Sequence, residues 1–271
     1  MFSRVCFVPW LVFWGFVFVL FQAQVSAQTK PFVFAYQNSD NFPYQVGDGN
    51  SIHPTNPGVA VEQMKYVMSQ LNANVEFHRV PWKRGLLLLK SGDIDGLFSA
   101  SFKEQRKEFG QYPMQGNQPD RTKRSYSNSY SIFKHVHGEI AWDGERFSGS
   151  GYKVFVPLGF SVANDLRRHG INVHEASDIL SQLHMLSSQR IDAVALLTPS
   201  GQGYLEKHPK LSSVITMVKP PLSTKDYYLM LSHQFVGQHP ELAERIWHEL
   251  GEVRNSPVFA RWFTKYQGRG E

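Results

Sequence analysis

Arg106 is the residue of this sequence best placed to bind an anion. It follows residues 89–101, which we read as a helix end, a tight turn, an Ile-Asp step and a buried strand ending in a hydroxyl residue. A guanidinium group can pair with both oxygens of a carboxylate. The alternative is a surface ion pair between Arg106 and Glu104 or Glu108. The first interpretation predicts an anion site close to the end of this strand.

A similar sequence pattern occurs a second time at residues 186–198, with Asp192 in the place of Asp95. No arginine follows this second copy. A repeated helix, turn and strand indicates two similar α/β lobes within one chain. An anion site that only one of two related lobes supplies suggests a ligand clamp more than an enzyme.

The spacing of apolar residues predicts the elements that hold these groups. In the first lobe we expect strands at 31–36, 75–80 and 94–99, and helices at 58–71 and 81–90. In the second lobe we expect strands at 153–156, near 173 and at 193–197, and helices at 161–169, 178–188 and 199–208. Strands at 130–135, 212–218 and 227–232 accompany the crossings between the lobes, and helices at 240–253 and 257–266 follow. Residues 37–57 read as a long polar loop of the kind that often carries function.

Strands that alternate with helices favour a mostly parallel sheet with helices on its faces. We therefore predict an α/β, two-lobed fold in which residues 28–130 and 225–271 form the first lobe and residues 131–224 form the second. The last segment is assigned to the first lobe because a sheet that begins at residue 31 needs helices on both faces.

Residues 1–27 have the layout of a secretory signal peptide, with Arg4, a long apolar run and small residues ending at Ala27. A membrane anchor that is not cleaved is the alternative. The single cysteine, Cys6, lies inside this segment, so we expect neither a disulfide nor a lipid anchor in the exported chain. The net charge of +5 comes from scattered basic residues, whereas nucleic-acid binding requires a clustered stripe. We expect a periplasmic monomer that binds no nucleic acid.

Several short motifs occur in a characteristic order along the chain. In the first lobe they are Pro81-Trp-Lys-Arg84, Lys90-Ser-Gly-Asp-Ile-Asp-Gly96, Ser99-Ala-Ser101, Glu104-Gln-Arg106 and Phe109-Gly-Gln-Tyr-Pro113. Further along they are Pro220-Pro-Leu222, Tyr227-Tyr-Leu-Met230 and Pro240-Glu-Leu-Ala-Glu-Arg245. In order and spacing, the chain from residue 28 onward resembles the amino-acid-type solute-binding proteins of bacterial ABC importers, extracellular solute-binding protein family 3.

The resemblance implies a type II periplasmic-binding-protein-like fold, in which two crossing strands join two lobes that close on a small ligand. Members of this family bind an α-carboxylate through an arginine, hydroxyl groups and backbone N–H groups. Matched to this sequence, the arginine is Arg106 and the hydroxyls are Ser99 and Ser101. Ser161 would contribute from the second lobe, and Trp82 stands where an aromatic ring covers the ligand side chain. The alternative for Trp82 is an ordinary position in the core.

One position departs from the family pattern. Leu197 stands where members usually carry an acid that binds the ammonium group of the ligand. Because an unpaired buried cation is costly, either the ligand lacks an α-amino group or another residue, such as Asp40, supplies the charge. Other side chains of the first strand and the long loop are candidates to face the ligand: Tyr36, Asn41, Phe42 and Tyr44.

Other kinds of chemistry find little support. His135 and His137 would share one face of a strand, but the sequence offers no third ligand at a spacing typical of metal sites. Residues 159–163 lack the second glycine of a nucleophile elbow, and Asp93 and Asp95 stand at a turn, where carboxylates usually bond locally. We therefore expect no catalytic residue, no metal and no cofactor.

The sequence thus predicts a periplasmic solute-binding protein that captures a small carboxylate-bearing solute, an amino acid or a related compound, for an inner-membrane ABC permease. Two alternatives keep the same fold. One is a ligand-sensing protein that reports to a membrane sensor. The other is an enzyme, which would need an acid–base pair in the cleft that the sequence does not reveal.

Overall fold

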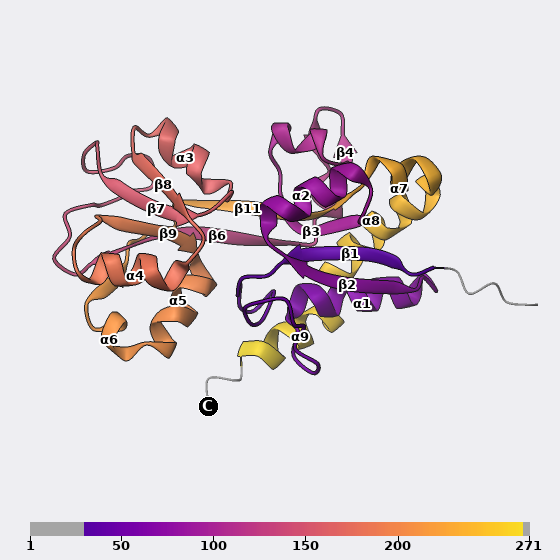
Figure 1. Ribbon diagram of the computed structural model, residues 1–271, viewed down its shortest axis with the longest axis horizontal. Helices are drawn as coiled ribbons and strands as arrows, with labels where there is room; N and C mark the ends of the chain where they lie inside the picture. Colours follow the sequence, from indigo (N-terminus) through magenta and orange to yellow (C-terminus); the bar gives the residue numbers. More distant parts are fainter. Residues whose placement is uncertain (1–29, 268–271) are drawn as a thin grey trace, which may run out of the picture. The chain divides into compact units, whose positions relative to one another are not determined.

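A mixed sheet of nine strands runs through the computed structural model, which describes residues 30–267 (Figure 1). The strands of its first part are β1 (Phe32–Gln37), β2 (Val75–Val80) and β3 (Gly96–Ser101). Those of its second part are β7 (Lys153–Pro157), β8 (Asn172–Ala176) and β9 (Ala193–Leu197). The predicted signal peptide, residues 1–27, lies outside the described residues.

The two parts have the same strand order. β1 lies between β2 and β3 and is parallel to both, and β7 lies between β8 and β9 and is likewise parallel to both. Two long strands, β6 (Tyr126–His135) and β11 (Ser223–Leu231), connect them. β11 is antiparallel to β3 and β6, and β6 is antiparallel to β9 and to β10 (Ile215–Met217). The molecule therefore has the expected two lobes joined by two crossing strands.

Helices pack on both lobes (Figure 1). In the first lobe they are α1 (Val59–Gln70), α2 (Trp82–Ser91), α7 (His233–Gln238), α8 (Pro240–Arg254) and α9 (Pro257–Gln267). In the second lobe they are α3 (Val162–Arg168), α4 (Ile179–Ser187), α5 (Thr198–Lys207) and α6 (Pro209–Ser212). Smaller elements of the first lobe are the 3₁₀ turns η1 (Glu104–Glu108) and η2 (Arg121–Lys123) and the hairpin β4 (Met114–Gln115) and β5 (Gln118–Pro119). Among the described residues, no helix has the length and apolar character needed to span a membrane.

The repeated Ile-Asp step has the same structural role in both lobes. Asp95 Oδ2 accepts a hydrogen bond of 2.8 Å from the Val33 N–H, and the Asp95 N–H donates to the Val33 carbonyl at 2.8 Å. Asp192 makes the same pair of bonds with the backbone of Lys153, at 2.7 Å and 3.0 Å. Each aspartate thus ties the start of the third strand of its lobe to the start of the first. These carboxylates are structural, but Asp95 bonds to a strand 62 residues away, whereas local bonds were expected for a residue at this turn.

The element boundaries differ from the prediction where local contacts compete with periodicity. β3 begins at Gly96 rather than residue 94, because the bonds of Asp95 hold the preceding residues in a turn. The strand expected at 212–218 is limited to β10, since α6 ends at Ser212. The helix α7 was not predicted. It begins after Ser232, whose Oγ accepts a hydrogen bond from the Phe235 N–H at 3.0 Å and caps the helix.

Candidate functional site

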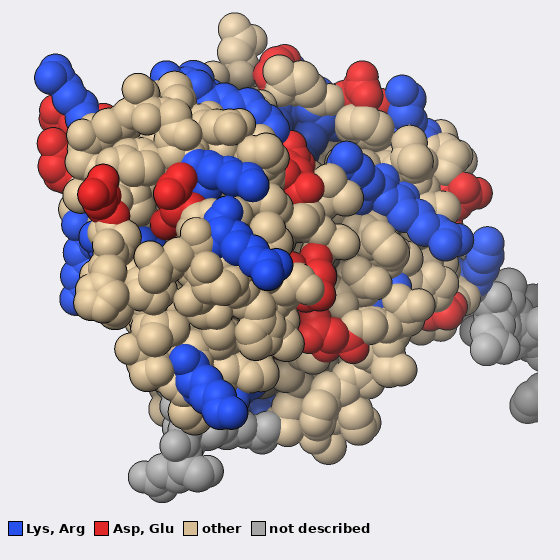
Figure 2. Space-filling model, turned by 60° about the vertical axis from the view of Figure 1, so that its left-hand side comes forward, with Lys and Arg blue, Asp and Glu red and all other residues tan. Residues whose placement is uncertain are grey.

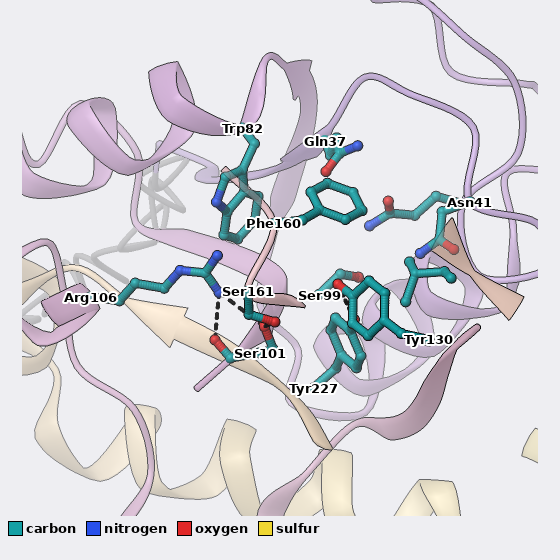
Figure 3. Close-up of a pocket in the computed structure, with 12 residues that line it drawn as sticks. Gln37, Asn41, Trp82, Ser99, Ser101, Arg106, Tyr130, Phe160, Ser161 and Tyr227 are labelled. Carbon is teal, nitrogen blue, oxygen red and sulfur yellow. Dashed lines mark hydrogen bonds between the residues drawn. The ribbon is translucent and has the colours of Figure 1, made fainter. Parts of the chain in front are cut away.

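A cavity of about 340 Å³, which includes its opening to solvent, is lined by both lobes and both crossing strands (Figure 3). Its lining residues are Gln37, Asn41, Gln45, Trp82, Ser99, Ser101, Arg106, Tyr130, Phe160, Ser161, Leu197 and Tyr227. Five of the seven residues predicted to bind ligand are among them: Trp82, Ser99, Ser101, Arg106 and Ser161. The other two, Tyr36 and Phe42, are not among the lining residues.

Arg106 lies in η1 and is only 5% exposed. Its Nη1 donates to the Ser101 carbonyl at 2.6 Å and to Ser101 Oγ at 3.1 Å, and its Nη2 donates to the Gly159 carbonyl at 3.1 Å. The guanidinium therefore bonds to both lobes. The alternative of a surface ion pair is wrong for the described residues: Arg106 is buried and pairs with neither Glu104 nor Glu108, and Glu104 pairs with Lys107 at 2.7 Å.

Trp82, the first residue of α2, packs against the guanidinium of Arg106. Arg106 Cζ lies 4.8 Å from the centre of the indole ring, which is a cation–π distance. The indole Nε1 is buried and makes no hydrogen bond with the described residues. The turn at Gly159 comes close to the other lobe here, since a Cβ atom at this position would lie 3.2 Å from Trp82 Cδ1. The aromatic ring thus fixes the arginine at one end of the cavity.

The serine side chains lie beside this arginine. Ser101 Oγ, at the end of β3, donates to Ser161 Oγ of the second lobe at 2.9 Å, in a second direct bond between the lobes. Ser99 has a left-handed backbone conformation, with φ at 62°, where the pairing of β3 with β11 shifts register. Such an irregularity redirects a side chain relative to a regular strand, and positive φ in a residue other than glycine often marks a functional position.

The crossing strands contribute two tyrosines to the cavity. The Tyr227 hydroxyl donates to the Tyr130 hydroxyl at 3.1 Å, and burial raises the pKa of both phenols, so both stay neutral in ordinary buffers. The Tyr227 ring stacks at 5.0 Å on Tyr126, which stacks at 3.9 Å on Tyr44. Leu197, at the end of β9, pairs with Tyr130 in the sheet and confirms that an apolar side chain occupies this side of the cavity.

The long loop supplies two amide side chains to the lining, and one of them, Asn41, lies at the far end from Arg106 (Figure 3). Asn41 and Gln45 are joined by backbone hydrogen bonds of 2.8 Å and 3.0 Å, and their side chains are 6% and 1% exposed. Asn41 Oδ1 and Gln45 Nε2 have no hydrogen-bond partner among the described residues. The cavity therefore has a cationic end and an uncharged polar end, with Phe160 between them in Figure 3.

Asp40, the proposed alternative acid, is not among the lining residues. Its carboxylate accepts a hydrogen bond of 2.6 Å from the Gly47 N–H and lies 3.8 Å from the Lys207 ammonium of the second lobe. Burial, the largest effect, raises the pKa of Asp40, and the Gly47 and Lys207 contacts oppose that rise. The Asp40 carboxylate is thus engaged by groups of the protein itself, Gly47 and Lys207.

Charged side chains surround a neighbouring opening, which shares Ser161 with the cavity. Burial, reinforced by the nearby charges of Arg106 and Lys225, lowers the pKa of Lys103 to about 8. Lys225 on β11 forms an ion pair with Asp165 of the second lobe. Over the face seen in Figure 2, lysine and arginine side chains are interspersed with acidic ones. The described residues contain no group of three or more histidine, cysteine or acidic side chains that could hold a metal ion.

Solved structures similar to this chain include a sensor domain and ligand-binding proteins. A histidine kinase sensor domain with similarity to periplasmic binding proteins matches with a TM-score of 0.67 and 20% identity, over 88% of this chain and 96% of its own. An amino-acid ABC transporter substrate-binding protein, AbpA from Streptococcus pneumoniae bound to L-arginine, matches with a TM-score of 0.66 and 13% identity, over 89% and 95%. An ancestral arginine-binding protein bound to glutamine matches with a TM-score of 0.65 and 18% identity, over 89% and 98%.

A search with protein-family models and a search of curated protein sequences found no match. The structural matches nevertheless span most of the chain and nearly all of each matched protein. They agree with the strand order and the two crossing strands described above. The chain therefore has the two-lobed α/β fold of periplasmic binding proteins and of the sensor domains that resemble them.

Proposed function

We propose that this protein is a family 3 solute-binding protein of the periplasm, which captures a small carboxylate-bearing solute between its lobes and presents it to an ABC importer. The observation that carries the proposal is the buried Arg106, whose guanidinium faces a cavity lined by both lobes. A buried guanidinium with serine hydroxyls beside it favours a carboxylate over neutral or cationic solutes. In the substrate-binding protein AbpA, the same fold is bound to L-arginine.

The proposal assigns residues 28–130 and 225–271 to one lobe and residues 131–224 to the other, with residues 1–27 as the export signal. The contacts from Arg106 to Gly159 and from Ser101 to Ser161 join the lobes directly, as in a closed clamp. We expect them to open when the lobes separate. The proposal includes no catalytic step: serine and tyrosine hydroxyls line the cavity, but the lining has no carboxylate or histidine to activate them.

A second function is favoured by one comparison. The histidine kinase sensor domain covers the chain as well as the transport proteins do, so ligand occupancy could be reported to a membrane sensor instead of a permease. Affinity capture of membrane proteins by ligand-loaded protein separates the two. Recovery of a permease supports transport, whereas recovery of a kinase or cyclase supports sensing.

The binding function is tested by a thermal-shift screen with amino acids and small organic acids. A solute that binds the folded state raises the melting temperature by mass action, by a free energy of about 2.7 kcal/mol at a hundred times its Kd. We expect a shift with at least one carboxylate and none with its methyl ester, which cannot pair with Arg106 as an anion. Equal shifts for an acid and its ester would contradict the assigned site, and recovery of a chemically altered solute would contradict a pure binding function.

Carboxylate binding should weaken as the pH rises through the pKa of Lys103, about 8. Below that pH the Lys103 ammonium adds positive charge near Arg106. A carboxylate that raises the pKa of Lys103 by half a unit would lose about threefold in affinity between pH 7 and 9.5. Isothermal titration calorimetry should show this loss, and Lys103→Met should remove it. If the affinity of Lys103→Met still falls over this pH range, the loss must come from another group, such as Lys225.

A further inference from the structure

Building on the proposed binding function, we infer that the solute is a carboxylic acid whose second polar group is uncharged, such as a hydroxy acid, a keto acid or an N-acylated amino acid, rather than a zwitterionic amino acid. The inference rests on the charges and the unpaired polar atoms of the cavity.

The lining of the cavity carries a single positive charge and no negative charge. Arg106 is a cation, and no other residue that lines the cavity carries a charge. A carboxylate ligand neutralises Arg106, so a zwitterion would bring an ammonium group that meets no opposite charge. A buried charge without a partner is strongly disfavoured. Leu197, which is buried at the side of the cavity, offers an ammonium group no hydrogen bond.

The acidic side chains near the cavity already have partners within the protein. Asp40 bonds to Gly47 and lies near Lys207. Glu175 accepts a hydrogen bond of 2.7 Å from the Gly159 N–H and pairs with Arg167 at 3.0 Å. Asp165 pairs with Lys225 in the neighbouring opening described above. Each acid would have to leave a cation or a backbone donor in order to compensate a ligand ammonium group.

The end of the cavity opposite Arg106 has polar atoms that lack hydrogen-bond partners within the described part of the chain. Asn41 Oδ1 is a free acceptor and Gln45 Nε2 is a free donor among the described residues, and both side chains are more than nine-tenths buried. A hydroxyl or an amide that reaches both atoms can donate to the first and accept from the second. An ammonium group has donors only and would leave Gln45 Nε2 without a partner. The free pair therefore matches a neutral group that both donates and accepts.

Figure 3 gives the arrangement of these two ends. Arg106 and Ser101 lie on one side, Asn41 lies on the other, and the Phe160 ring lies between them. The carboxylate of the solute would bind at Arg106, and its uncharged polar group would lie towards Asn41.

The test compares each amino acid with an acid in which a hydroxyl or an amide replaces the ammonium group. Isothermal titration calorimetry would use L-alanine with L-lactate, L-leucine with its hydroxy acid analogue, and L-glutamine with N-acetyl-L-glutamine. We expect the acid without the ammonium group to bind at least tenfold more tightly in every pair that binds at all. Equal or tighter binding of the amino acids would overturn the inference and leave the proposed binding function intact. Absence of binding by every carboxylate would overturn both.

A variant reverses the expected preference. Leu197→Asp places an acid at the side of the cavity and should shift the preference towards the amino acid by at least tenfold, while Leu197→Asn, of similar size but uncharged, should not. Gln45→Glu is a second variant of the same design and serves if Leu197→Asp fails to fold. An unchanged preference in a folded acidic variant would show that the cavity does not meet the amino group, which contradicts the inference.

Discussion

Arg106→Ala is expected to reduce carboxylate affinity about 10- to 100-fold, the range that corresponds to a hydrogen bond with a charged group worth about 1.5–3 kcal/mol. The variant removes the cation that lines the cavity together with its bonds to Ser101 and Gly159. Arg106→Lys should recover part of the affinity, because an ammonium group keeps the charge but not the planar pair of donors. Isothermal titration calorimetry of the best ligand found in the thermal-shift screen measures both effects.

The matched control for this experiment is Lys107→Ala. Lys107 lies next to Arg106 in η1 but is exposed and pairs with Glu104. Its removal also lowers the net charge by one, so it reports any effect of general electrostatic attraction. Affinity equal in Arg106→Ala and Lys107→Ala would show that the guanidinium does not hold the ligand.

Gly58→Ala is expected to cost about 3 kcal/mol of unfolding free energy or more, among the largest effects of any single methyl group in this chain. Gly58 has φ at 110°, and a Cβ atom there would lie 2.4 Å from the Tyr44 carbonyl oxygen. The clash is with backbone, so no change of side-chain conformation can relieve it. For a chain of this size the melting temperature should fall by roughly 6–12 °C. Thermal unfolding followed by circular dichroism measures the shift.

Gly49→Ala is the matched control for backbone conformation. Gly49 also has positive φ, at 82°, but an added Cβ atom would meet nothing within 4 Å. We expect only the smaller cost of a left-handed residue, about 1–2 kcal/mol. Similar losses in the two variants would mean that the clash at Gly58 is absorbed by movement of the loop. Since this loop carries Asn41 and Gln45, Gly58→Ala should also weaken ligand binding.

The repeated sequence pattern allowed the sheet of each lobe to be predicted from sequence. Asp95 and Asp192 stand before equivalent strands, and the structure gives both the same hydrogen bonds. Arg106 and Ser101 could be placed near each other because only a short turn separates them. In both cases the decisive contacts are local or belong to a repeated pattern.

The choice between Tyr36 and Gln37 needed information that the sequence does not contain. Successive side chains of a strand point to opposite faces, so one of the two faces the interior of the lobe and the other the cavity. Tyr36 is 1% exposed and packs on Phe98 at 4.8 Å, whereas Gln37 lines the cavity. Tyr36 was predicted to contact the ligand because it is aromatic. Which of the two residues does so depends on which face of β1 is turned towards the second lobe.

The long loop was predicted to carry function, but its path was not predictable. Distant residues hold it in place: the Gly58 N–H donates to the Tyr266 hydroxyl at 2.8 Å, and Arg79 Nη1 donates to the carbonyls of Val46 and Ser51 at 3.0 Å and 3.1 Å. These contacts place Gln45 at the cavity. Phe42 instead packs in the first lobe, with its ring 6.4 Å from that of Tyr266.

The two tyrosines of the cavity belong to the strands that connect the lobes. A solute in contact with Tyr130 or Tyr227 would therefore touch a connecting strand directly, with no other side chain in between. Under the proposed function, this direct contact would be the same whether a permease or a receptor recognises the loaded protein.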